Sequence, residues 1–273
     1  MKLWSIILLT FRESLAKKTF MAFLGISTFI CLLLIFALNL DIVNGMQSSV
    51  SLFGQDIESA AEITKILFGI ESGIAILLFS GGIFMSLFAT SSLVPSLLQE
   101  GYIDIFISKP VSRLDILLGR YLGAIVIVAL NIFYLVIFSG AILSIKTGIW
   151  NWGYLWAGVI IVLTFGALFA LMTFLSVLSR SGPLSLMITY LVLFFSPMLL
   201  ARDEIYALLS SPVYGYFFDG LYYFLPKTAE LGVILQKLVS NQPVESWMPL
   251  WSSMLFAVFM LAVTAYIFQK KNF

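Results

Sequence analysis

The sequence predicts an all-α integral membrane protein that crosses the bilayer six times. Of its 273 residues, 61% are hydrophobic and only 11% are charged, whereas an average soluble domain is about 25% charged. The mean hydropathy is +1.05. Stretches without charged side chains recur along the whole chain, and no internal repeat is evident. We therefore expect a single transmembrane domain over residues 1–273.

The composition also excludes several function classes. The net charge of +1 provides no basic field for nucleic acid. The chain has no histidine, which excludes Ser-His-Asp catalysis and the HExxH zinc helix. The one cysteine, Cys31, lies in an apolar run and is expected to act as a small core residue. We expect no catalytic residue, no metal site and no nucleic-acid partner.

Six stretches without Asp, Glu, Lys or Arg are long enough to span a membrane, which takes about 20 apolar residues. Tryptophans at 150, 152 and 156 mark the start of the fourth stretch as interfacial, so its spanning part is expected at Ala157–Leu178. Pro95 should end the helix of the second stretch near Ser92–Pro95. The six are Thr19–Leu40, Ser72–Gln99, Tyr121–Ile145, Thr147–Ser179, Ser181–Ala201 and Ser246–Gln269.

An even number of spans places both termini on one side of the bilayer. Basic residues are more frequent in the segments on that side than in the longer segments on the other. The positive-inside rule therefore predicts cytoplasmic termini. We expect the lipid bilayer to be the cytoplasmic membrane of a prokaryote.

Two segments are expected to lie on the membrane rather than cross it. In residues 1–18, Trp4, Leu8 and Phe11 recur at helical spacing, which predicts an interfacial amphipathic helix. The alternative is an extension of the first span. The outer segment, 202–245, is apolar in parts but too short to span, so we expect short helices in the outer leaflet or capping the spans.

Small and polar residues form stripes on two of the spans. Gly82, Ser86 and Thr90 share one face of the second, and Gly123 and Asn131 share one face of the third. Such stripes either line a substrate path or let helices pack closely, and the sequence leaves both interpretations open.

Ionisable residues are nearly absent from the expected spans. Glu71 stands at the outer end of the second span, where we expect its carboxylate to extend outward to water. Ion-coupled transporters usually carry acidic residues at mid-membrane. Their absence disfavours transport driven by an ion gradient.

The most specific stretch is EGYIDIFISKPVSRLDILLGRYLG, residues 100–123, between the second and third spans. It predicts a short amphipathic helix, a break at Lys109-Pro110 and the start of a further helix. Ser112, three residues before Asp115, resembles a capping box. A helix of this kind on the cytoplasmic surface is suited to contact with a partner protein.

This stretch resembles the permease subunits of the ABC type-2 exporter family, and most of all the branch that includes the permease of the nitrous-oxide-reductase maturation transporter. The resemblance rests on Glu-Gly, an apolar run, Pro-x-Ser-Arg, and Ile-Leu-Leu-Gly-Arg entering a span. The amphipathic N-terminal helix and the six-span layout are similar too. Glu100, Gly101, Pro110 and Arg113 match motif positions of the family.

The resemblance implies that residues 95–115 form a coupling segment that docks on a separate ABC ATPase. Two copies of this chain and two ATPase chains would make the transporter, with the first and fifth spans in the permease contact. No GxxxxGK[ST] loop is present, so ATP and Mg²⁺ would belong to the ATPase and this chain would hold no cofactor. The implied coupling residues are Glu100, Gly101, Asp104, Phe106, Lys109, Pro110 and Arg113.

Other functions compete with this one. Each coupling residue could instead serve only its own loop, by capping, turning or breaking a helix. An ATP-independent channel or scaffold that binds other membrane proteins is the main alternative. An ABC importer permease usually carries its coupling loop later in the chain. The sequence predicts no particular substrate.

Overall fold

A computed structural model of the chain describes residues 2–15, 18–43, 46–52, 55–57, 60–98, 112–202 and 212–270. These residues are helical almost throughout, with one small sheet. The helices are α1 (Lys2–Leu15), α2 (Lys18–Ala37), α3 (Ala60–Leu77), α4 (Ile83–Thr90), α6 (Arg113–Thr147), α7 (Trp152–Ser179), α8 (Gly182–Leu200), α10 (Pro212–Phe224), α11 (Thr228–Val239) and α12 (Met248–Lys270), with a π-helical turn η1 (Leu78–Gly82) and a 3₁₀ turn η2 (Pro95–Leu98).

Five helical stretches are long and apolar enough to cross a membrane, and a sixth results if α1 and α2 form one broken span. α1 and α2 are bent by 71° at their junction. The prediction of a helical integral membrane protein is confirmed at this level. The five stretches are Thr64–Leu97, Arg113–Thr147, Trp152–Ser179, Gly182–Leu200 and Met248–Lys270.

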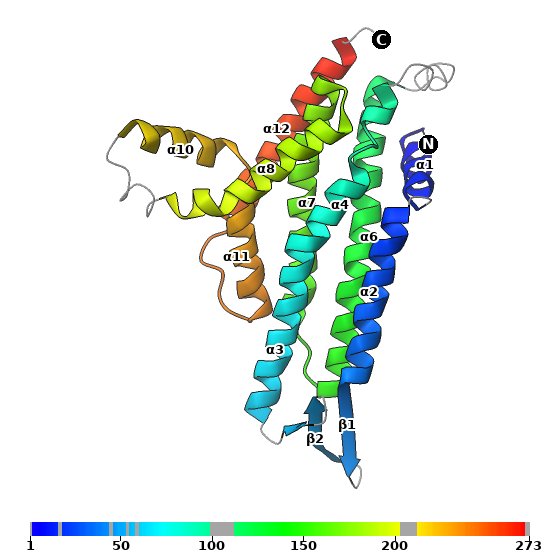
Figure 1. The fold of residues 1–273 in the computed structure, drawn as a ribbon, viewed down its shortest axis with the longest axis vertical. Helices are drawn as coiled ribbons and strands as arrows, with labels where there is room; N and C mark the ends of the chain where they lie inside the picture. The colour runs from blue at the N-terminus through cyan, green and yellow to red at the C-terminus, as the bar shows by residue number, and fades with distance from the viewer. Residues whose placement is uncertain are drawn as a thin grey trace.

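The long helices form a bundle with two distinct ends (Figure 1). α1, the start of α6 and the end of α12 lie toward one end, which we call the terminal end. The small sheet lies at the other, which we call the sheet end. At 35 residues α6 is the longest helix of the described part, and at about 1.5 Å per residue it reaches from one end to the other.

α7 lies at the centre and is buried on nearly all sides, because α4, α6, α8, α11 and α12 all pack on it. Its aromatic side chains form a stack with a neighbour on α6: the Tyr121 and Phe169 ring centroids are 5.6 Å apart, and those of Phe165 and Phe169 5.4 Å. The Tyr121 hydroxyl donates to the Gly166 carbonyl at 2.9 Å. The buried Thr164 of α7 is satisfied within the helix, since its hydroxyl donates to Ile160 O at 2.7 Å.

The π-helical turn η1 interrupts the second span. The backbone N–H of Ile83 reaches Leu78 O, five residues back. Glycines accommodate this wide turn: a Cβ at Gly81 would meet nothing within 4 Å, whereas one at Gly82 would lie 3.2 Å from Leu78. α4 stops at Thr90, a turn and the 3₁₀ turn from Pro95 follow, and the apolar stretch as a whole runs on to Leu97, past the end expected near Ser92–Pro95.

One small three-stranded antiparallel sheet follows α2 in the otherwise helical described part of the chain. Its strands are β1 (Leu38–Val43), β2 (Met46–Leu52) and β3 (Gln55–Ile57), in the order β1-β2-β3. Leu38 pairs with Leu52, and Leu52 with Gln55. In this arrangement β2 is hydrogen-bonded on both sides, while β1 and β3 form the edges.

Several span limits differ from those expected. The first span ends at Ala37 rather than Leu40, because its last residues enter β1. The second and third spans begin before Ser72 and Tyr121, because their helices include charged residues. These are Lys65 and Glu71 in the second span, and Arg113, Asp115 and Arg120 in the third.

We predict that the two ends of the bundle face opposite sides of the membrane. Gln242, beyond the end of α11, and Lys270, the last residue of α12, are both exposed. Gln242→Cys should react with an impermeant maleimide added to intact cells, and Lys270→Cys should react only after the cells are opened. Labelling of only Lys270→Cys in intact cells would show that the chain has the opposite orientation. Equal labelling of both variants would show that the two ends do not face opposite sides of the membrane.

Candidate functional site

The segment expected to couple to a partner lies mostly outside the described residues. Of the implied residues only Arg113, at the start of α6, is described. The chain enters this segment from η2 and leaves it at Ser112, so the structure does describe both of its ends. The implied residues within 99–111 are Glu100, Gly101, Asp104, Phe106, Lys109 and Pro110.

Both ends of the segment are held by the N-terminal helix. Leu97 of η2, Ile116 of α6 and Ile6 of α1 form a buried apolar cluster separate from the main core. We call these three residues the root. α1 thus contacts the described chain on both sides of residues 99–111.

Two glycines of α6 bring α1 to this position. A Cβ at Gly119 would lie 2.6 Å from Cγ2 of Ile6, and one at Gly123 would lie 2.7 Å from Cβ of Thr10. Real side chains do not approach so closely, so only glycine fits at both positions. Gly119 and Gly123 are four residues apart, as in other close helix contacts within membranes. Gly123, which the sequence placed on a small-residue stripe, thus lies in helix packing.

An ion pair joins the same two helices. Arg120 of α6 is completely buried and its Nη1 donates to Oε2 of Glu13, whose side chain is 29% exposed. Arg120 is the last residue of the Ile-Leu-Leu-Gly-Arg motif, and nothing in that motif predicts its pairing with Glu13. Its place directly after Gly119 explains the burial, since the guanidinium lies beneath the closely packed α1. A buried charge is tolerated only when it is paired and hydrogen-bonded.

The start of α6 is fixed in two further ways. Ser112 caps the helix, as its spacing to Asp115 predicts, by accepting a hydrogen bond from Asp115 N at 3.1 Å. Arg113 donates to Gln269 O at 3.5 Å, which links the start of α6 to the end of α12. At the terminal end, α1, α6 and α12 are therefore connected to one another around the two ends of the coupling segment.

All four candidate pathway residues are buried, so in this conformation they lie within helix packing rather than on an open surface. A Cβ at Gly82 would be 3.5 Å from Phe23 of α2. The Thr90 hydroxyl donates back to Ser86 O at 2.7 Å. Ser86 Oγ and Asn131 Oδ1 have no hydrogen-bond partner within the described part of the chain.

At the sheet end a single amide joins three helices. Asn151 caps α7 by accepting from Gly153 N at 3.0 Å. Its Nδ2 donates to Oε2 of Glu71 in α3 at 2.6 Å and to the carbonyl of Val239, the last residue of α11, at 2.8 Å. A Cβ at Gly153 would overlap the carbonyl oxygen of Leu238. α11 can press against the start of α7 only because residue 153 is glycine.

The expectation that Glu71 extends outward to water is wrong. Its exposed fraction is 1%, and its carboxylate is directed to Asn151. The nearby Tyr154 hydroxyl shares a hydrogen bond of 2.8 Å with Ser139 Oγ of α6. These buried polar groups form one junction between α3, α6, α7 and α11, which hydropathy alone does not reveal because the partners are far apart in sequence.

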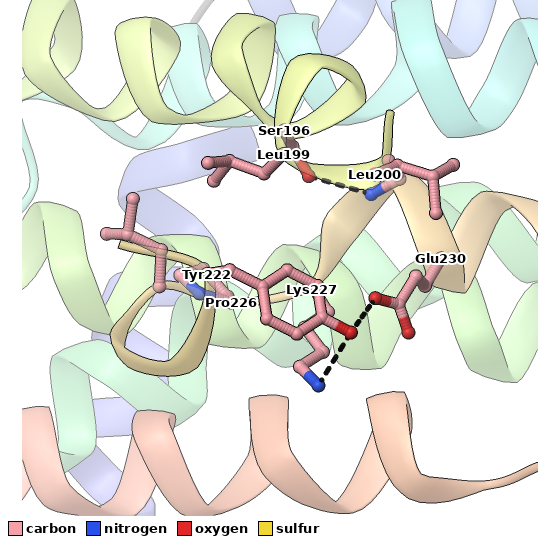
Figure 2. A pocket seen from close by; sticks show the side chains of 9 residues that line it. Ser196, Leu199, Leu200, Tyr222, Pro226, Lys227 and Glu230 are labelled. Carbon is pink, nitrogen blue, oxygen red and sulfur yellow. Dashed lines mark hydrogen bonds between the residues drawn. The ribbon is translucent and has the colours of Figure 1, made fainter. Parts of the chain in front are cut away.

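A second polar cluster lies in the outer segment (Figure 2). The Tyr222 hydroxyl of α10 donates to Oε1 of Glu230 in α11 at 2.5 Å and accepts from Lys227 Nζ at 3.0 Å. The Tyr222 ring also contacts two cations, with Arg202 Cζ 3.5 Å and Lys227 Nζ 4.1 Å from its centroid. The sequence does not predict this cluster, because its members lie on segments whose packing only the fold determines.

Hydroxyl groups of the neighbouring spans cap α11. Ser196 Oγ of α8 accepts from Ala229 N at 2.9 Å, and Ser253 Oγ of α12 accepts from Lys227 N at 3.1 Å. The crevice beside Tyr222 has a volume of only about 10 Å³, room for no more than one water molecule. The cluster is therefore a structural joint between α8, α10, α11 and α12.

Comparison with known protein families and with characterised proteins found no match to this chain.

We predict that the Arg120–Glu13 pair stabilises the packing of α1 against α6. Glu13→Ala leaves the buried guanidinium without this carboxylate. It should lower the free energy of unfolding by about 2–4 kcal/mol, less than for a fully buried pair because Glu13 contacts solvent. Unfolding of the purified protein in mild detergent with increasing denaturant measures this. The double variant Glu13→Leu with Arg120→Met should recover much of the loss, and a greater loss in the double variant would contradict the pairing.

We also predict that Gly153→Ala displaces α11. The added methyl group cannot coexist with the Leu238 carbonyl, so the hydrogen bond from Asn151 to Val239 must lengthen or break. A lower melting temperature and faster proteolysis between α11 and α12 are expected. Gly73→Ala is the matched control, since a Cβ there meets nothing within 4 Å. Equal melting temperatures and equal proteolysis of the two variants would show that the close contact between Gly153 and Leu238 contributes nothing to stability.

Proposed function

We propose that this chain is the membrane permease subunit of an ABC exporter, driven by a separate cytoplasmic ATPase. The observation that carries the proposal is the combination of the motif at 100–123 with the root. The residues that resemble a coupling segment connect two chain ends that are both fixed to α1 and α6. A loop that only connects two spans does not require both of its ends to be packed against the same two helices.

The mechanism follows from the stiffness of α6. ATP and Mg²⁺ bind to the ATPase, and closure of two ATPase chains moves residues 95–115. Because Ile6, Leu97 and Ile116 pack together, α1 and the start of α6 move with them. α6 carries the displacement to the sheet end, where Lys146 donates to Ile35 O of α2 and Ser139 contacts Tyr154 of α7.

The proposed assembly contains two copies of this chain and two ATPase chains. Large apolar side chains are exposed along α2 and α8, which are the first and fifth expected spans. Lipid or a second copy can cover such faces, so the family resemblance supplies the choice of these two helices. Native mass spectrometry of the purified complex tests the stoichiometry, and a monomer that never captures an ATPase would favour the channel or scaffold instead.

Substitutions in the coupling segment provide the decisive test. Glu100→Ala should weaken ATPase binding or transport-stimulated ATP turnover, since loss of one partner of a buried charge pair costs about 2–5 kcal/mol. Phe106→Asp should do more, because it places a charge in an apolar contact. Expression and membrane insertion should be unchanged. Turnover is measured with the purified transporter in lipid.

The controls for this experiment come from the sheet end. Lys65→Ala is suitable because Lys65 is exposed on α3. Lys146 is unsuitable, although it too lies at the sheet end, because it holds the end of α2. Arg113→Ala is informative only beside Arg113→Lys, since Arg113 also contacts α12. If Glu100→Ala, Phe106→Asp and Lys65→Ala all behave alike, residues 98–113 are only a connecting loop.

A further inference from the structure

A hollow of about 160 Å³ lies in the outer segment, between the end of α8, α11 and the chain that enters α12. An apolar cavity of similar size in another protein holds a benzene molecule, so this one admits a short apolar group. Its lining is mainly aliphatic, with charged residues beside it. The aliphatic side chains are Leu200, Val233, Ile234, Val244 and Pro249.

The charged side chains at the hollow have a definite arrangement. Lys237 Nζ donates to Glu245 Oε1 at 2.6 Å, and this hydrogen bond lowers the pKa of the Glu245 carboxyl from its usual value. Glu245 is 85% exposed in its side chain and Lys237 25%, so both are accessible to a ligand. Glu230 adds a second carboxylate. The hollow thus offers one ammonium group and two carboxylates next to an apolar floor.

The tryptophans indicate the depth of this hollow in the bilayer. Trp150 and Trp152 flank Asn151, which is bonded to the end of α11, and both are exposed. Trp247 and Trp251, at the start of α12, are exposed as well. Exposed tryptophans are enriched at the level of the lipid headgroups. The hollow therefore lies where a headgroup and the first part of an acyl chain are found together.

We propose that the hollow is a binding site for a phospholipid with a primary ammonium headgroup. The acyl chain would enter between Leu200 and Val233, the phosphate would accept hydrogen bonds from Lys237, and the ammonium group would donate to Glu245. A zwitterionic headgroup presents a charge opposite to each member of the Lys237–Glu245 pair, whereas an anionic headgroup brings no cation to Glu245 and competes with it for Lys237. This site is independent of the proposed export function.

Lipid retention tests the proposal without any ATPase. The purified chain is equilibrated in nanodiscs containing equal amounts of phosphatidylethanolamine, phosphatidylglycerol and phosphatidylcholine. After transfer to detergent, native mass spectrometry identifies the lipids that remain bound. The wild-type protein should retain phosphatidylethanolamine about tenfold over phosphatidylglycerol, as expected for one charge-assisted hydrogen bond. Phosphatidylcholine should also be disfavoured, because its quaternary nitrogen donates no hydrogen bond.

Three variants separate the headgroup from the acyl chain. Glu245→Gln should remove the preference for phosphatidylethanolamine and leave the fold intact, since exposed ion pairs contribute little to stability. Val233→Trp should abolish retention by filling the hollow. Lys65→Gln, on α3, should behave as wild type. Undiminished retention by Val233→Trp, or equal retention of the three lipids by the wild-type protein, would overturn the proposal.

Discussion

The burial of α7 is the constraint on which the rest of the structure depends. A helix that is apolar on nearly all sides can face either lipid or other helices, and in this bundle α4, α6, α8, α11 and α12 cover α7. Small residues let them approach: a Cβ at Gly158 would lie 3.2 Å from the Phe133 ring of α6. The two ends of α7 are fixed by the Asn151 cap and by Arg180, which adopts a left-handed conformation with φ of 54°. The positions of the other spans follow from these contacts.

The two ends of the bundle are built with different chemistry. At the terminal end, glycines at 119 and 123 allow direct contact between helices, and the Arg120–Glu13 pair fixes their register. At the sheet end, hydrogen bonds from side chains to carbonyl groups join helix ends, as Asn151 does for α7 and α11. Close packing transmits displacement in a fixed geometry. A few hydrogen bonds at helix ends can be exchanged at lower cost, because each contributes only about 1 kcal/mol net.

The sequence predicted the membrane-spanning character because composition alone determines it: the chain has too few charges to cover a soluble surface. It predicted the Ser112 cap because capping depends on neighbouring residues. It misplaced Glu71 and overlooked the Arg120 pair because burial of a charge depends on a partner that is distant in sequence. Glu71 meets Asn151 eighty residues later, and Arg120 meets Glu13 at a separation of 107. The sheet was missed because strands between spans leave no hydropathy signal.

The π-helical turn at Leu78–Gly82 determines which way each half of the second span faces. One residue corresponds to about 100° of rotation around an α-helix, so the wide turn alters the angular relation between α3 and α4. Glu71 before it faces Asn151, while Ile83 and Leu87 after it are completely buried. Deletion of one residue from the turn would restore regular winding and rotate one half against the other. Either the carboxylate would leave its amide or the aliphatic side chains would leave the core, so the length of this span is as constrained as its composition.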